Sequence, residues 1–331
     1  MNLHPASASV SAGFAAGGST QGGNANISGV LNAGMWSGSS ASWTSLHPSG
    51  ANYSEVWGAS SVSQVGYAHI GVTTHASLWT GTAGSWISLN PSFALGSIGY
   101  AATPTSQAGA VYAFSTVVAA YWTGSAGSFV NLNPTGASQS VAYGASGSIQ
   151  SGYANIAGVT SAGKWNGTSA SWVNMHPSGA TSSIAYAADA ASQAGYAVIG
   201  GSNHASLWTG TAGSWVDLHP TGATASTAWG VSGPYQVGGS VFGGIQRASL
   251  WTGSSGSHVD LHAFLPASFT NSVARSISTD GVNYYIVGIG RNSATFRDEA
   301  LLWTQPVPEP STLAALGLGA FALRRRKRTA K

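Results

Sequence analysis

The sequence predicts an all-β protein built from repeated four-stranded units, and a 43-residue repeat is the first observation behind this prediction. A tryptophan recurs six times at this spacing without insertion or deletion, and a seventh, Trp303, follows after 52 residues. Units of this size cannot each bury a core alone, so they must share one. The six tryptophans are Trp36, Trp79, Trp122, Trp165, Trp208 and Trp251.

The second observation is that each unit holds four short apolar runs separated by turn residues, which is the pattern of strands. One unit shows the runs at Thr227–Val231, Gln236–Phe242, Ala248–Trp251 and His258–Leu261. Four strands in roughly 40 to 45 residues is the length of a β-propeller blade. We therefore predict a seven-bladed β-propeller over residues 1–304. A right-handed β-helix is the alternative, but it usually repeats at a shorter period.

Composition supports a rigid β protein. Only 6% of residues are charged, against roughly 25% in ordinary soluble proteins, yet 10% are aromatic, which argues against disorder. The absence of cysteine excludes disulfides and thiolate metal sites. Six of the eleven Lys and Arg lie in the last eight residues, and the repeats carry a net charge of −2. No basic surface for phosphate contacts is expected, so nucleic acid is not an expected partner.

The first residues of the chain occupy an unusual position in the repeat. Met1-Asn2-Leu3 matches Val130-Asn131-Leu132, the end of a fourth strand, whereas the last unit has no fourth strand after Trp303. We expect the N-terminal residues to supply that strand and close the ring. We also expect a signal peptide and the rest of this strand to precede Met1.

Two further sets of residues follow the repeat. We expect Trp or Phe in the fourth strands, Gly, Ala and Ser near the axis where the blades converge, and glutamines that cap the turn between strands one and two. A ring of Gln amides that binds a hydroxyl-rich ligand is the alternative. The fourth-strand aromatics are Trp43, Trp86, Phe129, Trp172 and Trp215, and the glutamines are Gln21, Gln64, Gln107, Gln150, Gln193 and Gln236.

No group of residues predicts a catalytic, cofactor or metal site. The phased histidines fall on different blades, so we expect strand-end hydrogen bonds rather than convergent metal ligands. Five acids fall outside the phases, and we expect Asp298 and Glu299 in a solvated loop. We expect no enzyme activity and no cofactor. The phased histidines are His4, His47, His176, His219 and His262, with His75 and His204 in a second phase, and the unphased acids are Glu55, Asp189, Asp280, Asp298 and Glu299.

The repeats resemble the HAF family of extracellular repeats. The resemblance rests on His75-Ala-Ser-Leu-Trp79, Trp215-Val-Asp-Leu218, Ala228-Trp-Gly-Val231 and Gln236-Val-Gly238. Ser77 and Ser206 replace the Phe of that pattern. The resemblance implies an extracellular β-propeller-like array and no known reaction.

The C-terminal tail, residues 305–331, has three parts. A motif at Val307, Pro308, Glu309 and Pro310 precedes an apolar segment at 311–323, and a basic end holds Arg324, Arg325, Arg326, Lys327 and Arg328. As a helix the apolar segment spans about 20 Å, a marginal length for a membrane core of roughly 30 Å. The basic end would stay in the cytoplasm and leave the repeats outside it.

This tail resembles the PEP-CTERM sorting signal, also called the ice-binding protein C-terminal domain. The resemblance implies export through the inner membrane, a transient membrane anchor through a short transmembrane helix, and cleavage by an exosortase near Pro308-Glu309-Pro310. A tail that simply stays in the membrane is the alternative.

Together these observations predict a protein of the cell surface or extracellular matrix. We expect a structural or adhesive component of an exopolysaccharide matrix, with exosortase and exopolysaccharide as partners. A glycan-binding, lectin-like propeller is the second hypothesis, in which repeated sites would add avidity. A propeller hydrolase or lyase that uses the unphased acids is the third.

Overall fold

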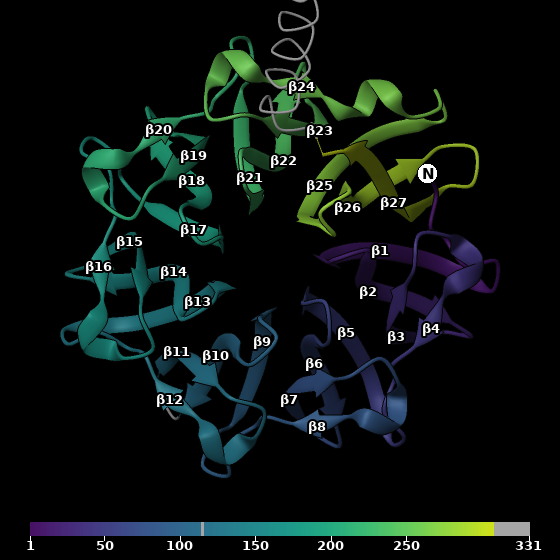
Figure 1. The fold of residues 1–331 in the computed structure, drawn as a ribbon, viewed down its shortest axis with the longest axis horizontal. Helices are drawn as coiled ribbons and strands as arrows, with labels where there is room; N and C mark the ends of the chain where they lie inside the picture. The colour runs from purple at the N-terminus through teal and green to yellow at the C-terminus, as the bar shows by residue number, and fades with distance from the viewer. Residues whose placement is uncertain (114–115, 308–331) are drawn as a thin grey trace, which may run out of the picture.

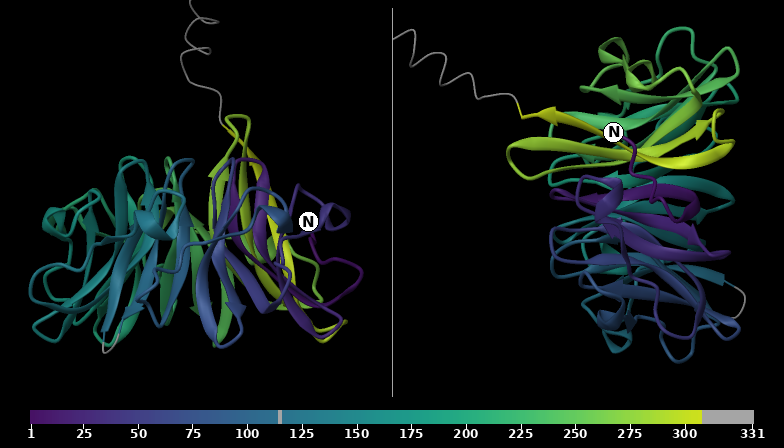
Figure 2. Two further views of the ribbon diagram at one scale, coloured as in Figure 1. Left: turned by 90° about the horizontal axis from the view of Figure 1, so that it is seen from below. Right: turned by 90° about the vertical axis from the view of Figure 1, so that its right-hand side faces the viewer.

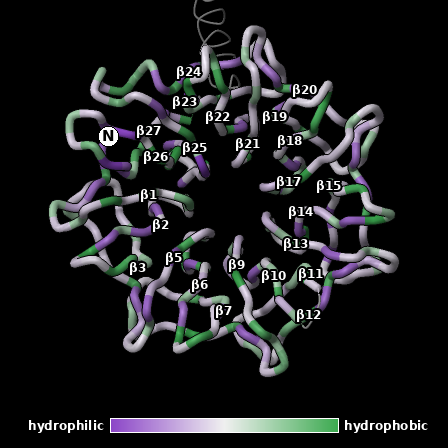
Figure 3. The backbone as a smooth tube through the Cα atoms, turned by 180° about the vertical axis from the view of Figure 1, so that it is seen from behind, coloured by the Kyte–Doolittle hydropathy of each residue, from purple (hydrophilic) through white to green (hydrophobic). Residues whose placement is uncertain are grey.

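Seven antiparallel sheets stand around a central axis in the computed structural model, which describes residues 1–113 and 116–307 (Figure 1). The sheets follow one another in chain order, and the first strand of each lies closest to the axis. The same first strands surround the axial opening when the ring is seen from behind (Figure 3). The seven-bladed propeller that the repeat predicts is therefore confirmed.

Each of the first four blades has three long strands, a 3₁₀ turn and a two-residue fourth strand. Blade one holds β1 (Ala8–Gly17), β2 (Thr20–Ile27), β3 (Val30–Trp36), η1 (Ser40–Ser42) and β4 (Thr44–Ser45). Blade two holds β5 (Ala51–Ala59), β6 (Gln64–Ile70), β7 (Thr73–Trp79), η2 (Ala83–Ser85) and β8 (Ile87–Ser88). Blade three holds β9 (Gly96–Ala102), β10 (Gln107–Ala113), β11 (Thr116–Trp122), η3 (Ala126–Ser128) and β12 (Val130–Asn131). Blade four holds β13 (Ala137–Ser146), β14 (Ile149–Ile156), β15 (Val159–Trp165), η4 (Ser169–Ser171) and β16 (Val173–Asn174).

Blades five and six repeat this arrangement, and blade seven has longer strands. Blade five holds β17 (Ser183–Ala188), β18 (Gln193–Ile199), β19 (Ser202–Trp208), η5 (Ala212–Ser214) and β20 (Val216–Asp217). Blade six holds β21 (Ala225–Ser232), β22 (Tyr235–Phe242), β23 (Ile245–Trp251), η6 (Ser255–Ser257) and β24 (Val259–Asp260). Blade seven holds η7 (Leu261–Phe264), β25 (Phe269–Thr279), β26 (Asn283–Asn292) and β27 (Arg297–Pro306). Figure 2 shows blade seven extending beyond its neighbours on one side of the ring.

The ring closes through the N-terminus, as the sequence predicts. Asn2 forms an antiparallel bridge with Leu301 of β27. The Leu3 amide donates to the Ala300 carbonyl at 2.8 Å, and the Leu302 amide donates to the Met1 carbonyl at 2.9 Å. The first residues thus supply the outer strand of blade seven, beside β27 in Figure 1.

The tryptophans of the 43-residue repeat are buried between neighbouring blades. All six are 0–1% exposed. Trp79 of blade two, for example, packs against Ala33 and Leu46 of blade one and against Val56. Burying such a large ring at every blade contact supplies apolar area that the small Gly, Ala and Ser side chains cannot supply.

The expected fourth-strand aromatics lie just before the fourth strands rather than within them. Trp43, for example, ends the turn η1, and its ring covers Gly34, where a Cβ atom would overlap it. Where the covered residue is serine, its hydroxyl accepts from the indole, as Ser77 does from Trp86 at 2.9 Å. The sequence predicts that these aromatic residues lie within the fourth strands. The prediction is wrong because a strand of two residues is too short to show an alternating pattern that would mark its ends.

Three of the six glutamines, Gln21, Gln150 and Gln236, join two turns of their own blade. The Gln150 Oε1 accepts from the Gly167 amide, after strand three, at 2.9 Å, and its Nε2 donates to the Ser148 carbonyl, in the turn between strands one and two, at 3.0 Å. All six are at most 4% exposed. The expected turn role is correct for these three glutamines, and the burial of all six argues against the alternative ligand-binding ring of amides.

The five histidines of the first phase hydrogen-bond to a serine in the first strand of the following blade. The Nδ1 of His176 lies 2.8 Å from the Ser183 hydroxyl, and its Nε2 lies 3.0 Å from the Ala180 carbonyl. Because a carbonyl only accepts, Nε2 carries the proton and Nδ1 accepts from the serine. The same hydroxyl accepts from the Ala162 amide of the preceding blade at 2.9 Å. This is the expected hydrogen-bonding role, and within residues 1–113 and 116–307 no three potential ligands gather around a metal position.

The expected short transmembrane helix at 311–323 lies outside the residues that the structure describes. Among residues 1–113 and 116–307, no helix has the length and apolar character needed to cross a membrane.

Candidate binding site in the axial channel

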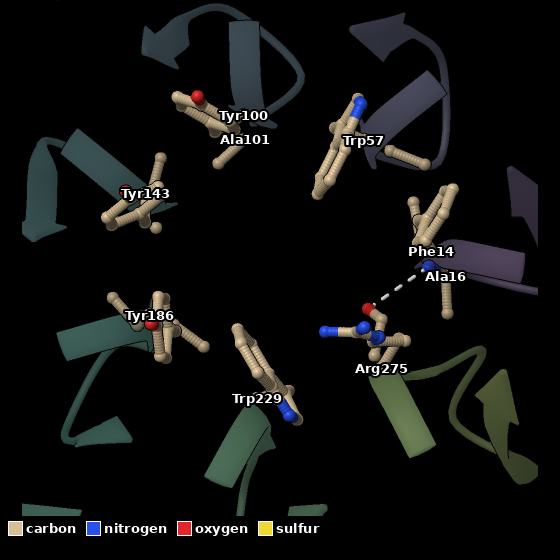
Figure 4. Close-up of a pocket in the computed structure, with 18 of the residues that line it drawn as sticks. Phe14, Ala16, Trp57, Tyr100, Ala101, Tyr143, Tyr186, Trp229 and Arg275 are labelled. Atoms are coloured by element: carbon tan, nitrogen blue, oxygen red, sulfur yellow. Dashed lines mark hydrogen bonds between the residues drawn. The ribbon is translucent and has the colours of Figure 1, made fainter. Parts of the chain in front are cut away.

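A β-bulge interrupts the first strand of every blade, at the position nearest the axis. At each bulge one residue has no partner on the second strand, so its side chain turns toward the axis (Figure 4). We call these seven half-buried residues the axial ring. The axial ring consists of Phe14, Trp57, Tyr100, Tyr143, Tyr186, Trp229 and Arg275.

The members of the axial ring contact one another around the channel. Phe14 and Trp57 stack with centroids 4.8 Å apart and planes 3° from parallel. Tyr186 and Trp229 stack at 4.2 Å. The Arg275 guanidinium lies 4.5 Å from the centroid of the Trp229 ring, a cation–π contact. Because each side chain of the axial ring packs against the next, these side chains are held in place before a ligand binds.

The axial ring encloses a pocket of about 200 Å³. A second cavity of about 100 Å³ is lined by the seven ring residues alone. The remaining lining of the larger pocket comes from the small residues that follow each bulge, such as Gly58 and Ala101. The expectation of only Gly, Ala and Ser at the axis is therefore wrong for one layer. The bulges direct large side chains into the open channel on the axis, which has room for them.

Arg275 is the one charged residue that lines either cavity. No carboxylate in the part of the chain that the structure describes forms an ion pair with it. Its Nε atom is buried and has no hydrogen-bond partner among these residues. Burial lowers the pKa of Arg275 from its ordinary value, and Tyr186 opposes this shift. A guanidinium stays protonated even so, so the pocket holds an uncompensated positive charge.

Tyrosine side chains line the side of the channel formed by blades three to five. Burial raises the pKa of the Tyr100, Tyr143 and Tyr186 hydroxyls above the ordinary value. These groups therefore stay protonated and can donate as well as accept hydrogen bonds. The pocket thus combines aromatic faces, three of them from tyrosines, and one cation.

Glu55 lies outside the pocket although it precedes Trp57 by two residues. Its carboxylate accepts from the Tyr67 hydroxyl and from the Asn24 side chain, the latter at 2.9 Å. Burial raises the pKa of Glu55, and the two hydrogen bonds oppose that shift. The Glu55 carboxylate is therefore hydrogen-bonded between blades one and two, and Glu55 does not line the pocket.

The other unphased acids serve turns or blade seven. Asp189 accepts from two backbone amides in the turn between β17 and β18, and Asp280 does the same between β25 and β26. The expected solvated loop at Asp298 and Glu299 is wrong, because both lie in β27. Glu299 is 1% exposed, whereas Asp298 forms an exposed 3.5 Å pair with Arg291.

The sequence analysis missed the axial ring although the signal was present. Aromatic residues recur every 43 positions from Phe14 to Trp229. A first strand with alternating residues predicts which side chains face the neighbouring blades, but the bulge that turns one side chain to the axis leaves no such pattern. The aromatic spacing shows which residues share this repeat position, and the structure shows that they face the axis.

The tail leaves the propeller beside the turn between β25 and β26. The Val307 amide donates to the Val282 carbonyl at 2.8 Å. Because β27 and β25 run in the same direction, Val307 lies at the face where the first strands end (Figure 2). Of the predicted sorting residues, Val307 alone is described, and Pro308 to Arg328 lie outside the described residues.

Comparison with known families identifies the tail. Residues 306–328 match the PEP-CTERM protein-sorting motif. The chain carries this sorting motif. It confirms the tail resemblance and is consistent with export and with membrane anchoring before processing. Among curated proteins none matches the chain.

Solved structures resemble the propeller. A puromycin hydrolase S511A mutant complexed with PGG has a TM-score of 0.57 at 11% identity, over 91% of this chain and 54% of that chain. A puromycin-hydrolyzing peptidase of Mycobacterium tuberculosis has a TM-score of 0.52 at 13% identity, over 90% of this chain and 54% of that chain. The chain thus spans about half the length of these proteins, and at this identity the likeness shows the fold alone.

Proposed function

We propose that this protein is an exported glycan-binding propeller of an exopolysaccharide matrix. Exosortase processes its tail, and the axial pocket binds a sugar of the matrix. The sorting motif at 306–328 supports the export step, and the resemblance to HAF repeats supports an extracellular location. This proposal joins the structural or adhesive role in the matrix to the lectin-like hypothesis.

The axial ring is the observation that carries the binding role. The C–H faces of a sugar ring are apolar and stack on aromatic rings, while its hydroxyls need hydrogen-bond partners. The ring offers aromatic faces from all six of its uncharged members, three of which are tyrosines. A pocket of about 200 Å³ holds roughly seven waters at about 30 Å³ each, which is close to the size of one sugar ring.

A purely structural propeller does not need this ring. Its cohesion comes from the buried tryptophans and the histidine–serine contacts between blades. Seven bulges that turn six half-buried aromatic side chains and one arginine into one channel add little to that core. Pockets of this composition, mostly aromatic with a few polar groups, are typical of ligand sites.

The proposal assigns no reaction to the pocket. Glu55 and Asp189, the acids on which a hydrolase would depend, do not line it. The likeness to hydrolases rests on fold, which does not transfer function.

We expect a Tyr143→Ala variant to bind matrix glycans about fivefold more weakly, because one stacked aromatic contributes about 1 kcal/mol. A glycan array with the purified protein identifies the ligand, and titration calorimetry measures the change. Phe264→Ala, which removes an aromatic side chain that is 72% exposed and outside the pocket, is the matched control. Equal affinity of the Tyr143→Ala and unchanged proteins would remove the pocket from the proposal.

We expect deletion of residues 308–331 to move the protein from the surface or matrix fraction to the culture medium or the periplasm, measured by fractionation and immunoblotting. Replacing Pro308-Glu309-Pro310 with alanines keeps the apolar and basic segments and separates cleavage from anchoring. We expect this variant to remain uncleaved in the membrane. Normal cleavage and location of the alanine variant would refute processing by exosortase.

A further inference from the structure

We propose that the axial pocket recognises an acidic sugar through its carboxylate, with Arg275 as the anchoring group. A hexuronate is the ligand class. This inference rests on the proposed glycan-binding function and specifies its ligand.

The first argument is the isolation of the Arg275 charge. Removing a guanidinium from water costs free energy unless an anion or several acceptors compensate it. Within the described residues Arg275 has no carboxylate partner, and its buried Nε has no acceptor. A carboxylate bound by the terminal N–H groups of the guanidinium would compensate this charge.

The second argument is the orientation of the guanidinium. Trp229 covers one of its faces at 4.5 Å, and Figure 4 shows the guanidinium pointing toward the centre of the axial ring. Its N–H edge is therefore available to the pocket, and that edge matches the two oxygens of a carboxylate. Other blades carry an aromatic residue at the position of Arg275, so this polar anchor occurs once in the ring.

The single positive charge of Arg275 also favours a carboxylate over a phosphate. One guanidinium neutralises one negative charge, which is the charge of a carboxylate. A phosphate monoester carries about −1.5 to −2 at neutral pH and would leave uncompensated charge among aromatic side chains. The aromatic faces around the anchor suit the ring of the same sugar. A uronate therefore satisfies both halves of the pocket.

The test compares methyl glucuronoside with its methyl ester, which removes the charge and keeps the sugar ring. Methyl galacturonoside, methyl glucoside, glucose 6-sulfate and glucose 6-phosphate complete the set, with the purified full-length chain in a calorimeter. We expect a uronate to bind about 10- to 100-fold more tightly than its ester and than methyl glucoside. Preference for the sulfate or the phosphate over both uronates would overturn the carboxylate assignment.

Variants of Arg275 provide the matching protein-side test. We expect Arg275→Gln to lose the preference for the uronate and to keep the weaker binding of methyl glucoside, with an unchanged melting temperature as the folding control. An unchanged preference in Arg275→Gln would refute the inference.

If the unchanged protein binds uronate and methyl glucoside equally, this inference fails and glycan binding stands. If it binds no sugar on the array or in the calorimeter, both fail. The ester comparison needs no variant, so it decides the question even if Arg275→Gln does not fold.

Discussion

A Gly152→Ala variant is expected to lose about 3 kcal/mol or more of its free energy of unfolding, at the upper end of the cost of overpacking. A Cβ atom on Gly152 would overlap the carbonyl oxygen of Val141 on the neighbouring first strand. The atoms that this Cβ would meet, in Val141 and Ala142, belong to the backbone, so the two strands themselves must separate. Equivalent glycines follow the buried glutamines by two residues in the other repeats.

Gly127→Ala is the matched control, because a Cβ there has nothing within 4 Å. We expect its stability to change by less than about 1 kcal/mol. Urea denaturation of both variants, followed by tryptophan fluorescence, measures the difference. A Gly152→Ala protein as stable as Gly127→Ala would contradict the close approach of the two strands.

Glu299→Gln is expected to destabilise the closed ring by about 3 kcal/mol at neutral pH. The Glu299 carboxylate accepts from Asn2 at 2.7 Å, Thr295 at 2.8 Å, Arg297 at 2.9 Å and Asn292 at 3.1 Å. Burial opposes the charge, but these hydrogen bonds outweigh it and lower the pKa of Glu299 to about 2. Because Asn2 belongs to the N-terminal strand and the other donors to blade seven, this carboxylate helps to hold the closure.

The pH dependence follows from the direction of that shift. The folded pKa lies below the ordinary value of 4.5, so the stabilisation is complete above about pH 4.5 and is lost as the pH falls toward 2. We expect the stability of the unchanged protein to fall across this range by about 3 kcal/mol more than that of Glu299→Gln. Thermal unfolding between pH 2 and 7 measures it. Parallel curves for the two proteins would contradict the role of Glu299.

Asp298→Asn is the control for the neighbouring carboxylate. Its side chain is 51% exposed and lies 3.5 Å from Arg291, so we expect a change of less than about 1 kcal/mol.

The repeat made much of the fold predictable. The spacing of the tryptophans gave the number and size of the blades, and the match of Met1-Asn2-Leu3 to a fourth strand predicted how the ring closes. Both follow from rules that act along the chain, because a residue at a fixed repeat position meets the same neighbours in every blade. The prediction failed at Glu299, whose partners come from the opposite end of the chain and from the irregular last blade.

The sequence by itself determined a seven-bladed propeller, an acidic body without disulfides, and a sorting tail, because period, composition and motif are properties of the linear chain. Only the tertiary structure decided where the site lies. The aromatic residues of the first strands become one pocket because a bulge in each blade turns a single side chain to a common axis. Arg275 becomes an isolated charge because, within residues 1–113 and 116–307, the blades offer it aromatic rings and no carboxylate partner. The seven side chains converge on one axis only when the blades close into a ring, and no local segment of the chain contains this arrangement.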